Sequence, residues 1–142
     1  MKLSENFTLQ EFLKSATAIR HGFKEQFTPP KDVVDNLQTL CVMLLQPIRN
    51  LYGMPIRISS GYRCKRLNKA VKGKPNSQHL TGQAADIDFG NAEDNLLLFN
   101  QIKEWQERGL IDFDQLIDEY KGSWVHISYN KGNNRNQVLR IK

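Results

Sequence analysis

Residues 77–89 read SQHLTGQAADIDF, a glycine-containing turn that leads into a predicted strand. His79 leaves the turn, and Asp86 follows on the strand that we expect over residues 83–89. Imidazole nitrogens and carboxylate oxygens are both standard zinc ligands. The glycine and the two alanines of this stretch would let the backbone pack closely behind a metal ion. The stretch therefore predicts part of a metal site.

A second stretch, WVHISY at residues 124–129, reads as another strand. Alternate side chains of a strand face opposite ways, so His126 shares a face with Trp124 while the other face is apolar. A catalytic zinc site uses three protein ligands and leaves a fourth position for water. His79, Asp86 and His126 supply that number. On spacing alone, an ordinary structural role for these residues stays open.

The remaining pattern places helices before and between short strands. A capping box at Thr8–Glu11 begins a helix that we expect to end near Ser15. A second helix is expected over 31–51, with a kink at Pro47 and an end at Gly53. Two more helices are expected over 63–71, with Leu67 and Val71 facing inward, and over 92–108. A loop is expected over 20–30, and strands over 55–59, over 114–120 and 124–129 as a hairpin, and over 137–141. This order predicts an α+β fold with a small, mainly antiparallel sheet packed with helices. We expect one domain over residues 1–142.

Composition narrows the class of protein. The formal net charge is +5, from 20 Lys and Arg against 15 Asp and Glu, and the basic residues are scattered along the chain. Scattered charge without an aromatic platform argues against nucleic-acid binding. We expect no membrane span and see no signal peptide, which predicts synthesis in the cytoplasm. Cys41 fits an apolar helix as a buried thiol, whereas the state of Cys64 stays open.

Four segments carry a resemblance to a known family: SGYRC at 60–64, Leu67-Asn68, SQHLTGQAADI at 77–87, and WVHISY at 124–129. They resemble the zinc D-Ala-D-Ala carboxypeptidase family, which includes cell-wall carboxypeptidases and phage endolysins. The family pattern is Ser-x-His-x-x-Gly-x-Ala-x-Asp followed by Trp-x-His or Trp-His, and this chain matches it at each named position. The resemblance implies the Hedgehog/DD-peptidase fold.

The resemblance also implies a function. It implies a Zn²⁺ ion held by His79, Asp86 and His126, a peptidoglycan peptide as substrate, and action at the cell wall after release or export. We expect a monomer. Arg63 would stabilise negative charge on the scissile carbonyl oxygen or hold a substrate carboxylate. Three further residues are predicted to contact substrate: Ser77, Trp124 and Tyr62.

The general base departs from the family pattern. Many members carry an acid three residues before the second histidine, where this chain has Ser123. Glu119 and Asp118 on the preceding strand are the alternatives, and the hairpin register decides which one shares the face of His126. We favour Glu119. The rival interpretation is a non-catalytic zinc-binding module, as in Hedgehog domains, and the bond that is cut stays open.

Overall fold

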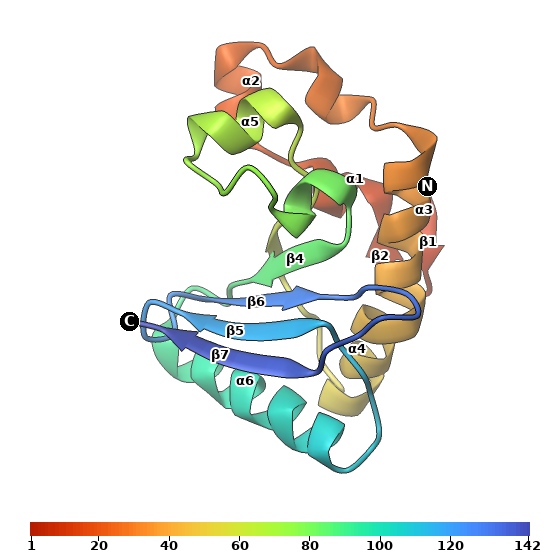
Figure 1. Ribbon diagram of the computed structural model, residues 1–142, viewed down its shortest axis with the longest axis vertical. Helices are drawn as coiled ribbons and strands as arrows, with labels where there is room; N and C mark the ends of the chain where they lie inside the picture. The colour runs from red at the N-terminus through yellow and green to blue at the C-terminus, as the bar shows by residue number, and fades with distance from the viewer.

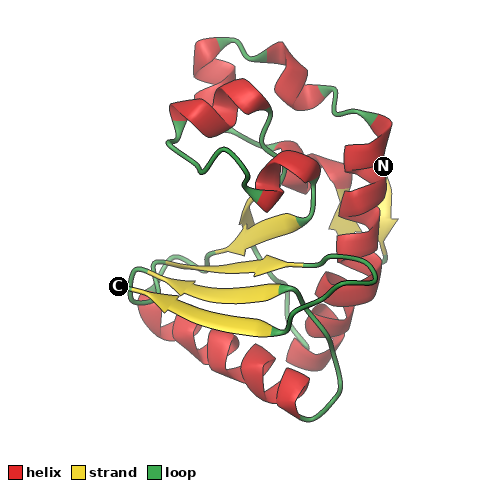
Figure 2. Cartoon of the chain, viewed as in Figure 1, coloured by secondary structure: helices red, strands yellow, loops and turns green.

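The computed structural model describes residues 1–142 and contains helices and strands in mixed order (Figures 1 and 2). The α-helices are α1 (Leu9–Leu13), α2 (Ala16–His21), α3 (Lys31–Leu40), α4 (Gln46–Tyr52), α5 (Lys65–Ala70) and α6 (Ala92–Glu107). Shorter helical turns are η1 (Lys24–Phe27), η2 (Cys41–Leu45) and η3 (Gln78–Thr81). The strands are β1 (Lys2–Ser4), β2 (Phe7–Thr8), β3 (Ile58–Ser60), β4 (Ala84–Ile87), β5 (Gln115–Glu119), β6 (Trp124–Ser128) and β7 (Gln137–Ile141).

The main sheet has five strands in the order β3-β4-β6-β5-β7. Its neighbours pair antiparallel except β5 and β7, which are parallel. The expected α+β class with a mainly antiparallel sheet is therefore confirmed. A separate two-stranded sheet, β1-β2, was not predicted, since its strands are too short to show an alternating pattern.

One face of the main sheet is covered by α6, which lies below β5, β6 and β7 in the view of Figure 1. Side chains on this face are fully buried, among them Leu116, Val125 and Ile127. From α6, Leu98, Phe99 and Ile102 are fully buried in the same core. The expected apolar face behind His126 is confirmed, and His126 itself lies on the opposite face.

The long helix expected over 31–51 is present but interrupted. Between α3 and α4, the segment η2 adopts π-helical geometry, and the Gln46 amide donates to the Cys41 carbonyl. The interruption comes just before Pro47, which has no amide proton to donate to the preceding turn. Gly53 ends the helix in the left-handed conformation with φ of 78°, as predicted.

The N-terminal capping box is also present: the Thr8 amide donates to the Glu11 carboxylate at 2.7 Å. The loop expected over 20–30 was partly wrong, because α2 extends to His21 and η1 follows it. The Ser15 hydroxyl oxygen accepts from the Ala18 amide and so caps the start of α2. We had expected Ser15 only as the end of the first helix and had not recognised it as the cap of a second one.

Three other expectations need correction. The strand expected over 55–59 is displaced to β3, and the helix over 63–71 shortens to α5. Leu67 is buried, but Val71 is 45% exposed because it lies beyond the last helical turn.

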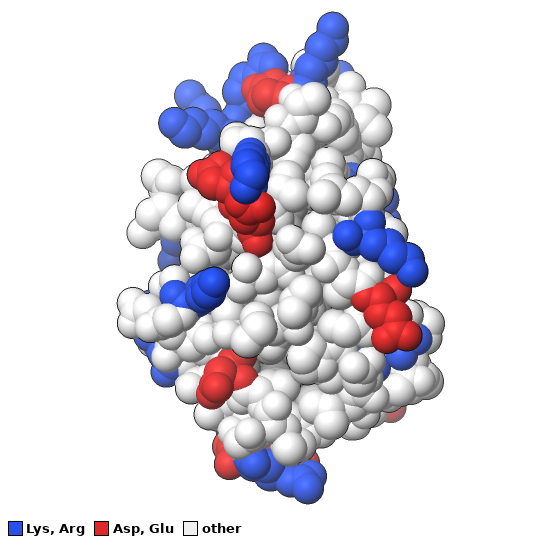
Figure 3. Space-filling model, turned by 90° about the vertical axis from the view of Figure 1, so that its right-hand side faces the viewer, with Lys and Arg blue, Asp and Glu red and all other residues white.

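Both cysteines are free and buried, and burial raises the pKa of the Cys41 thiol. The structure has no helix whose length and apolar character would suffice to cross a bilayer. On the face shown in Figure 3, basic and acidic side chains stand in separate small groups without a continuous basic area.

Candidate metal centre

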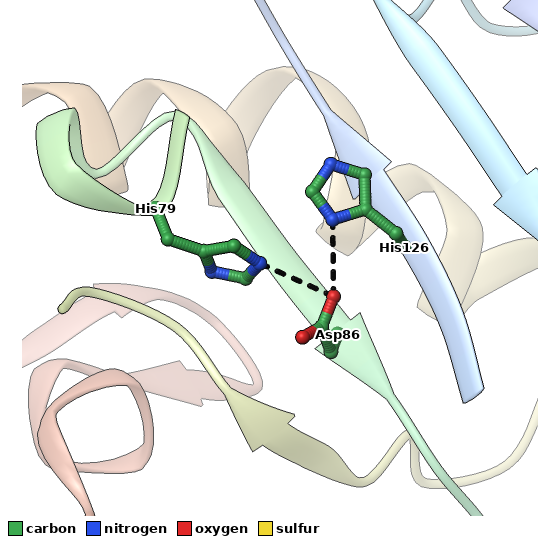
Figure 4. Close-up of side chains that lie close together, drawn as sticks. All are labelled: His79, Asp86 and His126. Atoms are coloured by element: carbon green, nitrogen blue, oxygen red, sulfur yellow. Dashed lines mark hydrogen bonds and ion pairs between the residues drawn. The ribbon is translucent and has the colours of Figure 1, made fainter. Parts of the chain in front are cut away.

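His79, Asp86 and His126 lie together on the open side of the sheet (Figure 4). The Nε2 atom of His79 is 3.2 Å from Asp86 Oδ1, and the Nδ1 atom of His126 is 3.1 Å from the same oxygen. One candidate ligand atom from each residue lies within 4.8 Å of the others. All three side chains are buried. The residues that two separate motifs suggested as ligands thus form one cluster.

Strand pairing accounts for this convergence. Asp86 on β4 and His126 on β6 are directly opposite each other in the antiparallel ladder. Directly opposed residues place their side chains on the same face, about 5 Å apart at Cβ. His79 lies in η3, which ends at Gly82 in the left-handed conformation with φ of 77°. A Cβ atom at Gly82 would lie 2.6 Å from the Val33 carbonyl oxygen, so only glycine allows this turn to pack on α3.

A backbone carbonyl sets the orientation of the His79 ring. Its Nδ1 atom lies 2.7 Å from the Gly61 carbonyl oxygen, which can only accept a hydrogen bond. Nδ1 therefore carries the proton, and in a neutral imidazole the Nε2 lone pair faces Asp86 Oδ1. A cation between these two atoms would be coordinated by both of them.

The spacing of the ligand atoms also fits a small tetrahedral metal ion. Two ligands at about 2.0–2.1 Å from a tetrahedral zinc ion lie about 3.3 Å apart. The observed 3.1 and 3.2 Å separations are close to that value. The donor set, two imidazoles and one carboxylate, is among those that bind zinc. Both separations that involve Asp86 therefore fit a small tetrahedral metal ion.

Charge at the cluster is set by Asp86. Burial would raise its pKa, but the imidazoles of His79 and His126 more than offset this and hold the pKa well below its usual range. The carboxylate is therefore ionised. Arg63 adds a positive charge, with Nη2 3.6 Å from Asp86 Oδ2. Burial lowers the pKa of Arg63, while Asp86 and Glu119 oppose that change.

The Arg63 guanidinium is held from behind by Asn68. Arg63 Nη1 donates to Asn68 Oδ1 at 2.9 Å, and Asn68 Nδ2 donates to the Lys74 carbonyl. Asn68 is itself buried. A Cβ atom at Gly73 would lie 2.6 Å from Arg63 Nη1, so this glycine leaves room for the guanidinium. Arg63 is fixed beside the cluster rather than free at the surface.

The backbone that carries Arg63 is held by Gln26. The Gln26 amide group donates to the Tyr62 carbonyl at 2.8 Å and accepts from the Cys64 amide at 2.9 Å. It also donates to the Leu13 carbonyl, and its side chain is fully buried. Because the Arg63 amide donates to the His79 carbonyl, the same loop connects both halves of the site.

The hairpin register separates the two candidates for a general base. Glu119 lies opposite Trp124, and Ile117 lies opposite His126. Glu119 therefore shares the face of His126, whereas Asp118 lies on the α6 side. There, the buried Asp118 accepts from the Gly122 amide and from Arg140. Burial and the charge of Asp86 raise the pKa of Glu119.

A groove of about 1110 Å³ runs over the cluster. All eight predicted site residues line it, namely His79, Asp86, His126, Arg63, Glu119, Ser77, Trp124 and Tyr62. Tyr62 is largely buried, and the Ser77 hydroxyl oxygen accepts from the His79 amide to cap η3. Trp124 packs edge to face on Tyr120. The structure brings these residues together, while their contacts with substrate remain predictions.

Sequence reasoning missed the supporting residues. Asn68 belongs to a segment that carried the family resemblance, so its presence was noted without a role. Gln26 and the Gly61 carbonyl left no signal, because their partners lie 13 to 38 residues away in the chain: Gln26 bonds backbone groups, and the Gly61 carbonyl contacts the His79 ring.

The sequence pattern of the family described as Peptidase M15 matches residues 5–128. No curated protein matches the sequence significantly.

Proposed function

The chain belongs to the Peptidase M15 family, and from that premise we propose that it is a zinc metallopeptidase that hydrolyses amide bonds in peptidoglycan peptides. Membership confirms the family that the motifs indicated, and a peptidase family implies a peptide substrate. The observation that carries the proposal is the buried His79, Asp86 and His126 cluster at the base of a groove. Peptidoglycan as the substrate rests on the resemblance of the motifs.

The charged groups next to the metal cluster have distinct roles in the proposed reaction. Zinc, when bound by the three ligands, acidifies water and polarises the scissile carbonyl. Glu119 takes the proton of the attacking water and passes it to the leaving amine. Its raised pKa suits a group that must accept and then release a proton. Arg63 stabilises the negative charge that develops on the carbonyl oxygen.

The rival is a non-catalytic zinc-binding module on the same fold. Ser123 favours it, because this side chain offers no carboxylate and instead donates to the Tyr120 carbonyl. Glu119 favours the enzyme, since it supplies a carboxylate from the neighbouring strand on the face of His126. The two interpretations differ in what happens when Glu119 loses its charge.

The decisive experiment compares metal content and turnover. We expect about one zinc per chain by elemental analysis, and cleavage of purified peptidoglycan that a chelator abolishes. Glu119→Gln should keep its zinc and lose about 10²- to 10⁴-fold in turnover, the usual contribution of a general base. Mass spectrometry of the released muropeptides identifies the bond that is cut.

Matched variants make the result specific. Glu104→Gln, at an exposed position of α6, should behave like the wild type, and His126→Ala should lose both zinc and activity. A Glu119→Gln variant with full turnover would rule out this base. Zinc binding without any peptidoglycan cleavage by the wild type would favour the non-catalytic module.

A further inference from the structure

The groove continues from the metal cluster onto an apolar part of the sheet. Ile117 on β5 pairs with His126 on one side and with Leu139 of β7 on the other. In the next row, Glu119 lies between Trp124 and Ile141. Paired residues share a face, so both rows face the groove, and all of these residues line it. We call Ile117, Leu139 and Ile141 the apolar floor.

Val138 of β7 packs on the core, but the last three residues of the strand, 139–141, reverse the usual alternation of an exposed edge strand. Arg140 points to the α6 side, where its guanidinium lies 4.7 Å from the Phe99 ring and bonds Asp118. Leu139 and Ile141 point to the groove, each 37% exposed. Exposed apolar side chains on an edge strand favour aggregation unless a ligand covers them. The floor therefore has the character of a binding surface.

Distance from the cluster limits what can occupy the floor. Neighbouring strands lie about 4.8 Å apart, so Ile117 is one spacing and Leu139 two spacings from His126. A long aliphatic side chain, on a residue next to an amide held at the metal cluster, spans that distance. The strand that supplies Leu139 and Ile141 lies beyond the residues that match the family pattern, so family membership does not account for the floor.

We propose that the apolar floor binds a long aliphatic side chain of the peptide substrate, beside the amide that is cut. The inference rests on the proposed zinc peptidase function. Figure 1 shows why β7 can supply such a surface: it lies at the end of the sheet next to β5, with α6 beneath it. Substrates with a short side chain at this position leave the floor uncovered and bind more weakly.

Metal-anchored probes test the floor without knowledge of the scissile bond. Acetohydroxamic, butanohydroxamic, hexanohydroxamic and octanohydroxamic acids share one metal-binding group and differ only in the aliphatic chain. With zinc-loaded protein, calorimetry should show affinity that rises about tenfold from the two-carbon to the six-carbon acid, as expected if about two of the added methylenes are buried. Leu139→Ser and Ile141→Ser should each remove most of this increase and leave acetohydroxamic acid binding unchanged.

Controls separate the floor from the metal site. Leu97→Ser changes a leucine that is 56% exposed on α6, and it should keep the full dependence on chain length. With peptidoglycan as substrate, the two floor variants should raise KM and leave kcat within about twofold, because they do not touch the reacting atoms. Thermal unfolding checks that each variant folds. Because Leu139 and Ile141 are changed separately, the test still stands if one of the two variants does not fold.

The outcomes are distinct. Affinity that does not depend on chain length in the wild type, or a dependence that survives in both folded floor variants, would overturn the apolar floor and leave the zinc peptidase standing. If no hydroxamic acid binds and the protein holds no zinc, the proposed function fails, and the floor fails with it.

Discussion

Neutral polar groups hold the side chains of this site in place. The Gly61 carbonyl orients the His79 ring, and the Asn68 amide oxygen accepts from Arg63. The Gln26 side chain hydrogen-bonds the backbone on both sides of Arg63, at the Tyr62 carbonyl and the Cys64 amide. Such contacts fix direction without adding charge, so the electrostatic balance among the ligands and Arg63 is left to those residues themselves.

Gln26→Leu should destabilise the protein strongly. The substitution keeps the volume but leaves the Leu13 and Tyr62 carbonyls and the Cys64 amide buried without a partner. Each buried unpaired group costs about 1–3 kcal/mol, so for three such groups we expect a loss of at least roughly 3 kcal/mol in the free energy of unfolding. Urea unfolding measures it, with Gln38→Leu at an exposed position of α3 as the control. Equal stability of the two variants would contradict the role of Gln26.

Single residues differ in how far the sequence predicts them. His79, Asp86 and His126 could be predicted as a cluster because their types are restricted by metal chemistry and two motifs contain them. Gln26 could not, because glutamine in a loop is usually a solvent-exposed residue and nothing local indicates burial. The hydrogen-bond partners that bury Gln26 lie up to 38 residues away in the chain.

Between elements, Asp114 connects three segments of the groove wall. It precedes β5 and accepts from Gln78 of η3 at 2.8 Å. Arg135, between β6 and β7, donates to both carboxylate oxygens at 2.8 and 2.9 Å. Asp114 is buried, whereas the Arg135 side chain is 54% exposed. The element that carries His79 is thus tied to the end of the sheet.

Asp114→Asn should weaken the protein at neutral pH by about 1–2 kcal/mol, a figure reduced because Arg135 is half exposed. Hydrogen bonds from Arg135 lower the pKa of Asp114 against the opposing effect of burial, and Gln78 lowers it further. A lowered pKa gives stability that is present above the unfolded value of about 3.9 and is lost as the pH falls through the folded value. The difference between wild type and variant should therefore shrink below about pH 4.

Unfolding curves from pH 3 to pH 7 measure this difference. The exposed Asp112→Asn, two residues earlier, is the matched control and should track the wild type throughout. A stability difference for Asp114→Asn that stays constant down to pH 3 would contradict the assigned ion pair.

Elements were predicted best where one local signal defines them. The hairpin from β5 and β6 follows from alternation around a glycine-containing turn, yet its register depends on which strand faces pack on α6. The sequence left Glu119 and Asp118 both open for that reason. The interruption at η2 and the exact limits of β3 depend on packing against distant segments, which local propensity does not report.

At the scale of the whole molecule, a metal ion would add one more link between η3 and the main sheet. His79 comes from the segment next to α3 and α5, while Asp86 and His126 belong to the sheet. A ligand that binds only the folded chain stabilises it by about 2.7 kcal/mol at a concentration one hundred times its Kd. Zinc should therefore act as a cross-link between the sheet and the upper wall of the groove.

Removal of zinc should lower the melting temperature by roughly 5–12 °C, from that free energy and the usual sensitivity of a chain of this size. Differential scanning calorimetry before and after dialysis against a chelator measures the shift, and readdition of zinc should restore it. His126→Ala is the control, because it should melt at one temperature with or without chelator. An unchanged melting temperature in zinc-loaded wild type would contradict the cross-link.

The direct pairing of Asp86 with His126 has a consequence for how the chain folds. A slip of one residue between β4 and β6 would turn one of these side chains to the α6 side and separate the ligands. Misaligned chains therefore gain nothing from the metal, whereas correctly aligned ones are held by it. During folding, zinc in the surrounding solution would therefore select the correct register of β4 and β6, because it stabilises only the alignment that forms the site.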